Sequence, residues 1–167
     1  DDRTYVGDAQ PDLTFGWQNN FTWKNWDFSF FFRGTIGNKV LNNPRAAYAN
    51  NTYLIGTNAL DDELTYTMKE SSRVCSYYLE NGSFIRLDNL ALGYTFDTKK
   101  INWLDKARLY FAAQNLFVIT GYKGLDPEVE LFRGESSDTD AGLSPGIEPR
   151  QFFPKARTFT LGVNLTF

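Results

Sequence analysis

Carboxylate side chains gather in one stretch that lacks a regular secondary-structure pattern. They are Asp126, Glu128, Asp138 and Asp140. Oxygen ligands of this kind suit a hard cation such as Ca²⁺. The stretch has neither the ligand spacing of an EF-hand loop nor a glycine at the sharp turn that such a loop requires. A solvated acidic loop is therefore the favoured interpretation, the four residues stand only as candidate ligands, and we expect no metal and no cofactor.

Residues that carry most enzyme mechanisms are absent or isolated. The 167-residue chain has no histidine, which removes the commonest general base and metal ligand. Asp61, Asp62 and Glu63 could do acid–base chemistry, but adjacent loop acids are more often simple surface residues. Cys75 is the only cysteine, and no histidine or cation cluster accompanies it to activate its thiol. We do not expect an enzyme.

Aromatic side chains also occur in the irregular stretches. Tyr53, Tyr122 and Phe132 are candidates for stacking on a sugar ring or touching another ligand. Packing within the loops, against a covering partner or at a membrane interface is the alternative. The formal net charge is −3 and no basic cluster exists, which argues against a nucleic-acid partner.

Among the elements that position these residues, the clearest is a predicted strand at the end of the chain, at about 156–167. Apolar side chains fall on one face of an extended chain, at Phe159, Leu161, Val163, Leu165 and Phe167. Small polar side chains fall on the other face. No run of about 18 apolar residues exists, which excludes a transmembrane helix. An apolar lipid face opposite a polar lumen face is typical of an outer-membrane β-barrel strand.

The same alternation predicts four further strands, at about 12–23, 27–36, 83–97 and 107–119. Asn19 interrupts one apolar face, and Phe31 places an aromatic ring on a polar one. The apolar parity changes near Asp88 and Asn89, which predicts a β-bulge. The sequence thus predicts an all-β fold, an antiparallel segment of a transmembrane β-barrel.

Two long stretches, 37–82 and 121–154, carry no strand period; we call them the first and second connections. A short helix near 59–70 is conceivable within the first. Short and long connections alternate along the chain, as periplasmic turns and extracellular loops do in outer-membrane barrels. The chain end is then periplasmic, both long connections are extracellular, and an aromatic girdle maps to the periplasmic rim, at Trp23, Trp26, Phe96, Trp103 and Phe167.

Five strands cannot close a membrane barrel, because open edges in lipid leave backbone groups unpaired. The missing strands are expected upstream or on a separate chain. The first residues lack the features of a signal peptide, so an export signal is also expected further upstream.

Five ordered motifs resemble the C-terminal end of the SusC/RagA family of TonB-dependent outer-membrane transporters from Bacteroidetes. They are GDAQP at 7–11, DFSFFF at 27–32 with GNKV at 37–40, ENGSFIRLDNL at 80–90, AQNLFVITGYKGLDPE at 113–128 and FPKARTF at 153–159. The stretch 42–76 corresponds to a variable external loop. The resemblance spans nearly the whole chain.

This resemblance implies the last five strands of a 22-stranded barrel, without the N-terminal plug domain. It implies import of oligosaccharides or peptides, a SusD-like surface lipoprotein as lid, and energy from TonB, ExbB and ExbD through the missing N-terminal part. The terminal strand resembles the signal that the barrel-assembly machinery reads, centred here on Leu161, Val163, Leu165 and Phe167. A non-transporting adhesin or receptor in the same membrane, working through its long loops, is the alternative.

Overall fold

The structure is a computed structural model that describes residues 4–49, 56, 58, 60–62, 75–98, 103–129, 145–150 and 153–167. The chain divides into two compact units. The sheet unit comprises Thr14–Gly34, Ile85–Ile119 and Lys155–Phe167. The connection unit comprises Asp1–Leu13, Thr35–Phe84 and Thr120–Pro154. Among the described residues, no helix is long and apolar enough to cross a membrane.

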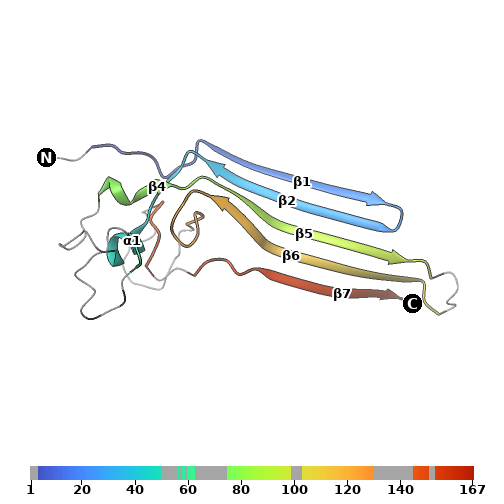
Figure 1. The fold of residues 1–167 in the computed structure, drawn as a ribbon. Helices are drawn as coiled ribbons and strands as arrows, with labels where there is room; N and C mark the ends of the chain where they lie inside the picture. The colour runs from blue at the N-terminus through green and yellow to red at the C-terminus, as the bar shows by residue number, and fades with distance from the viewer. Residues whose placement is uncertain are drawn as a thin grey trace, which may run out of the picture. The chain divides into compact units, whose positions relative to one another are not determined.

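Five long strands form one antiparallel sheet, in the order β1-β2-β5-β6-β7 (Figure 1). They are β1 (Leu13–Trp23), β2 (Trp26–Ile36), β5 (Phe84–Phe96), β6 (Lys106–Thr120) and β7 (Thr158–Thr166). Each of their ends lies within about two residues of the strand bounds that the period-2 pattern predicted. The predicted all-β, antiparallel fold class is confirmed.

One face of this sheet is apolar and largely exposed, and we call it the apolar face. At the end of the chain it consists of Phe159, Leu161, Val163 and Leu165 of β7 and of Phe167 directly after it, all exposed. Aromatic rings join its neighbouring strands: Trp17 of β1 packs against Phe30 of β2 with centroids 5.3 Å apart, and Trp26 of β2 lies 4.7 Å from Tyr94 of β5. The expected girdle residues Trp23, Trp26, Phe96, Trp103 and Phe167 are likewise exposed.

The opposite, polar face contains glycines. Long side chains from a neighbouring strand cover these glycines. The ring of Phe31 on β2 lies over Gly16 of β1, and the ring of Tyr110 on β6 lies over Gly162 of β7. Packing an aromatic ring over a strand glycine replaces the contacts that the missing side chain cannot make. This explains why Phe31, alone among its neighbours, breaks the polar pattern.

Strand β5 changes face between Asp88 and Gly93. The Asp88 carboxylate accepts a hydrogen bond from Arg33 of β2 and forms an ion pair with it. A side chain at Gly93 would meet Asp27, which is also on β2. Arg33 and Asp27 share parity on β2, whereas positions 88 and 93 do not. The two strands therefore differ by an odd number of residues between these contacts, which agrees with the predicted bulge.

The β6–β7 ladder runs from Lys106 opposite Thr166 to Gln114 opposite Thr158. Just beyond its end, Asn115 has a positive φ of 51°, a conformation that asparagine tolerates better than most residues. Its side-chain amide donates to the carbonyl of Ala156 at 3.2 Å. The Asn115 side chain thus supplies a hydrogen bond at the point where the backbone ladder ends.

The connection unit holds short elements that the sequence did not predict. They are β3 (Lys39–Leu41), α1 (Asn43–Tyr48), the 3₁₀ turn η2 (Ser76–Tyr78) and β4 (Leu79–Asn81). β3 pairs antiparallel with β4, and Leu41 also bridges to Ile147 in parallel fashion. A small core of Ala46, Ala49 and Tyr78, with Leu41 against it, fills the space beside them. The stretch 37–82 shows no strand period in the sequence, because three-residue strands are too short to produce one. The stretch 59–70, where a short helix is conceivable from the sequence, falls mostly outside the described residues.

Candidate functional site

The chemically richest place in the connection unit is centred on Arg45, in the first turn of α1. Asn42 caps this helix by accepting from the Arg45 backbone N–H at 3.0 Å, and Pro44 lies in its first turn. The Arg45 side chain is buried, with Nε 2.6 Å from Asp62 and Nη1 3.1 Å from Glu80. These carboxylates, Asp62 foremost, raise the pKa of Arg45 although burial opposes the shift.

Glu80 ties the first connection to the second. Its Oε1 accepts from the Asn42 side-chain amide at 3.2 Å as well as from Arg45. Its Oε2 accepts from the backbone N–H of Lys123 at 2.7 Å. Both carboxylate oxygens are therefore occupied by donors from residues far apart in sequence, and the two connections are held in a fixed arrangement.

A second tie is formed by Glu148, which has no exposed surface. Its carboxylate accepts from the Tyr122 hydroxyl at 2.5 Å and from the Leu125 backbone N–H at 2.9 Å. Its own backbone N–H donates to the Leu41 carbonyl at 3.0 Å. Burial, and then the bond to Glu148, raise the pKa of Tyr122. Glu148 thus fastens both ends of the second connection to β3.

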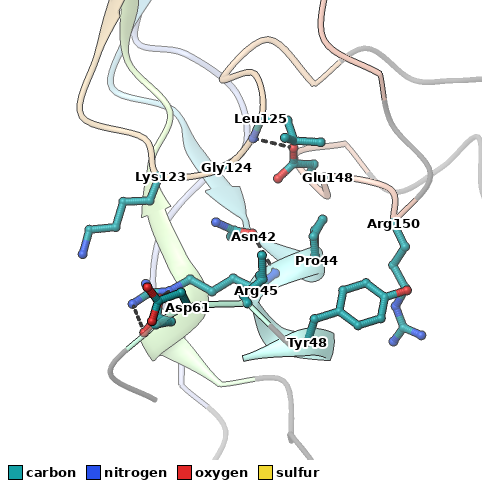
Figure 2. A pocket seen from close by; sticks show the side chains of 12 residues that line it. Asn42, Pro44, Arg45, Tyr48, Asp61, Lys123, Gly124, Leu125, Glu148 and Arg150 are labelled. Carbon is teal, nitrogen blue, oxygen red and sulfur yellow. Dashed lines mark hydrogen bonds and ion pairs between the residues drawn. The ribbon is translucent and has the colours of Figure 1, made fainter. Parts of the chain in front are cut away.

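Between these ties lies a cavity of about 380 Å³, shown in Figure 2. Both connections supply its lining, which consists of Asn42, Pro44, Arg45, Tyr48, Leu60, Asp61, Asp62, Lys123, Gly124, Leu125, Glu148 and Arg150. Tyr48 and Arg150 lie on one side of it in this view, and Lys123 lies on the other. The lining combines an aromatic ring, apolar side chains and three cations, which suits a small polar ligand with an apolar part.

The structure places the loop residues predicted from sequence as follows. Tyr122 is buried and its hydroxyl is held by Glu148. Asp126 is also buried, and its Oδ1 accepts from the backbone N–H of Glu128 at 2.9 Å. No group of three or more potential metal ligands occurs among the described residues. Tyr53, Phe132, Asp138 and Asp140 lie outside the part of the chain that the structure describes.

Sequence reasoning missed the residues that build this cavity. The Asn-Pro pair before Arg45 is a local signal that could have marked the start of α1. Nothing local marks Glu80 or Glu148, because their partners lie 35 and 26 residues away in the chain. At the end of the chain, by contrast, the predicted assembly-signal residues Leu161, Val163, Leu165 and Phe167 are all exposed.

Comparison with known proteins finds relatives that agree with one another in their general role. No family model matches the chain. The chain is 34% identical over 180 residues to TonB-dependent receptor P3 of Formosa agariphila, a match that covers 99% of this chain and 17% of that receptor. It is 31% identical over 170 residues to TonB-dependent receptor SusC of Bacteroides thetaiotaomicron, covering 93% of this chain and 15% of that receptor.

Among solved structures, the RagAB peptide importer in its closed-closed state superposes with a TM-score of 0.72 and 25% identity. That match covers 95% of this chain and 18% of the importer chain. The present chain thus spans less than a fifth of the length of these relatives. All of them are receptors or transporters rather than enzymes, in agreement with the absence of a catalytic constellation in the sequence.

Proposed function

The chain belongs to the SusC/RagA family of TonB-dependent outer-membrane proteins, of whose β-barrel it forms a segment, and from this we propose that it serves nutrient import. The proposed cargo is an oligosaccharide or a short peptide. The sheet unit is proposed to be part of the barrel wall, and the connection unit to be part of the external surface that meets cargo.

The observation that carries this proposal is the division of the sheet into two chemically opposite faces. Exposed aromatic and aliphatic side chains cover one face, and on β7 they include Leu161 and Val163. Ion pairs and covered glycines make up the other, including the pair between Arg108 and Asp27. Such an apolar face is favourable against hydrocarbon, and the paired charges suit a water-filled lumen.

Both edges of the sheet support a position within a larger barrel. β1 and β7 each have one neighbour in the described sheet. In hydrocarbon, an unpaired backbone group costs several kcal/mol, so both strands are proposed to pair with barrel strands outside this chain. The apolar face of β7 is proposed as the surface that the barrel-assembly machinery reads.

The proposed orientation follows from connection length. The two short connections lie in the periplasm, and the two long connections lie outside the cell. A SusD-like lipoprotein would cap the external side, and TonB with ExbB and ExbD would act through the plug domain of the full-length transporter. These partners are inferred from the family resemblance, because no local feature of the described residues indicates them.

The test uses the full-length protein in its native host. We expect deletion of the gene to abolish uptake of labelled oligosaccharides or labelled peptides, and the intact gene to restore it. Uptake should also disappear when TonB is removed. A deletion strain that imports both nutrient classes normally but loses attachment to a surface would contradict import and favour an adhesin.

A further inference from the structure

We propose that the cavity between the two connections binds the free C-terminal carboxylate of a short peptide whose last side chain is apolar. The idea rests on the proposed import function, because the peptide would be cargo. It goes further by assigning a site, a chemical group and a role to particular residues.

The carboxylates of the cavity are already engaged by the protein. Asp62 accepts from Arg45 through both oxygens, at 2.6 and 3.3 Å. Glu148 accepts from Tyr122 and from the Leu125 backbone. Asp61 also has an interaction within the protein. Few acceptors are therefore left for the hydroxyl groups of a sugar, whose recognition needs both donors and acceptors.

Two cations of the cavity, in contrast, are not engaged by any residue that the structure describes. Neither the ammonium of Lys123 nor the guanidinium of Arg150 forms a hydrogen bond or ion pair with another residue that the structure describes. Both side chains are exposed. Arg45 is not available in this sense, because Asp62 and Glu80 hold its guanidinium. The free polar groups thus favour an anion, and a guanidinium fork matches a carboxylate in two-point fashion.

The remaining lining favours an apolar group beside that anion. Pro44, Tyr48, Leu60 and Leu125 line the same space as Arg150. Tyr48 lies on the Arg150 side of the cavity (Figure 2). A carboxylate held by Arg150 therefore places the neighbouring side chain of its ligand within reach of an aromatic ring. The volume of about 380 Å³ is within the range of small-ligand pockets and suits one or two amino-acid residues.

The cavity is also held in shape before any ligand arrives. Glu80 links Arg45 and Asn42 to the Lys123 backbone, and Glu148 fixes the Leu125 backbone beside them. Groups that are already fixed lose little conformational freedom on binding, which favours affinity.

The experiment measures binding to the full-length transporter by calorimetry. The probes are the peptide Ala-Ala-Leu with a free carboxylate, the same peptide with a C-terminal amide, and digalacturonic acid. We expect the free-acid peptide to bind about 10- to 100-fold more tightly than the amide, as a charge-assisted hydrogen-bonded contact predicts. Equal affinity for acid and amide, or binding of digalacturonic acid without the peptide, would overturn the proposal.

Variants then locate the contact. Arg150→Gln should remove most of the preference for the free acid, and Arg150→Lys should keep part of it, since lysine retains the charge but not the fork. Arg157→Gln, which removes another exposed cation outside the cavity lining, is the matched control and should leave the preference unchanged. An unchanged acid preference in Arg150→Gln would place the carboxylate elsewhere. Uptake measured in strains that carry these variants separates this proposal from the proposed import function. Import can persist even when the cavity does not bind a carboxylate.

Discussion

Arg108 on β6 holds Asp27 on β2 across the strand that lies between them. Its Nε donates to Asp27 Oδ1 at 2.9 Å and its Nη2 donates to Oδ2 at 2.5 Å, a two-point contact. The guanidinium passes over Gly93 of β5, where a Cβ atom would meet both Arg108 and Asp27 side-chain atoms. The pair between Arg108 and Asp27 therefore depends on the lack of a side chain at Gly93.

Gly93→Ala is predicted to break this pair. The added methyl group occupies the path of the guanidinium, so the charge-assisted bonds are lost and unfolding of the barrel should need about 1–3 kcal/mol less. Urea unfolding of the full-length protein in detergent measures the change. Gly121→Ala is the matched control, because nothing lies within 4 Å of its added Cβ. Equal stability of the two variants would show that the pair adjusts around a methyl group.

Arg45→Met is predicted to loosen the connection unit while leaving the sheet intact. Removal of the guanidinium leaves Asp62 and Glu80, whose side chains are largely buried, without their cation, at a cost of about 3 kcal/mol. Hydrogen exchange followed by mass spectrometry should show faster exchange in β3 and β4 and unchanged exchange in β6. Arg45→Lys should be intermediate, and protection of β3 and β4 equal to wild type in Arg45→Met would refute the role assigned to this ion pair.

The connection unit is predicted to weaken at alkaline pH through Tyr122. Its pKa in the folded protein is raised above the ordinary value of 10.0. The unfolded chain therefore releases the phenol proton first as pH rises, so this contribution to stability is complete below about pH 10 and declines above it. Subtilisin cleavage of the second connection between pH 8 and 11, normalised to a denatured substrate, should accelerate above pH 10. Tyr122→Phe should remove that part of the pH dependence, and an identical profile in the variant would contradict the assignment.

Val163→Arg is predicted to cost about 2–4 kcal/mol of barrel stability, since we propose that the apolar face of β7 contacts lipid, where an arginine near the midplane is strongly unfavourable. Thr160→Arg, on the polar face of the same strand, should cost far less. Thr160 is a cleaner control than Asn164, because Asn164 stands opposite Arg108 in the β6–β7 ladder and a second arginine there would add repulsion. Refolding yield into detergent and urea midpoints provide the comparison, and equal tolerance at the two positions would contradict the assigned faces.

The fold was predictable wherever side-chain alternation extends over many residues. All five long strands have that length, and even the change of face near Asp88 is visible in the parity of Ile85 and Leu90. The candidate cavity was not predictable, because it depends on contacts between distant residues, most of which lie outside helices and strands. Asp126 and Glu148 look like solvated loop acids in the sequence, yet both are buried and hydrogen-bonded.

The glycines of the polar face have a consequence for how strands find their partners. Alternating polarity penalises a slip of one residue but is indifferent to a slip of two, which returns every side chain to its proper face. At Gly162, a two-residue slip would put Thr160 or Asn164 beneath the Tyr110 ring instead of a glycine. The ring would then have no place to lie flat. Each covered glycine thus disfavours a two-residue slip, an alignment error that the hydrophobic pattern alone does not penalise.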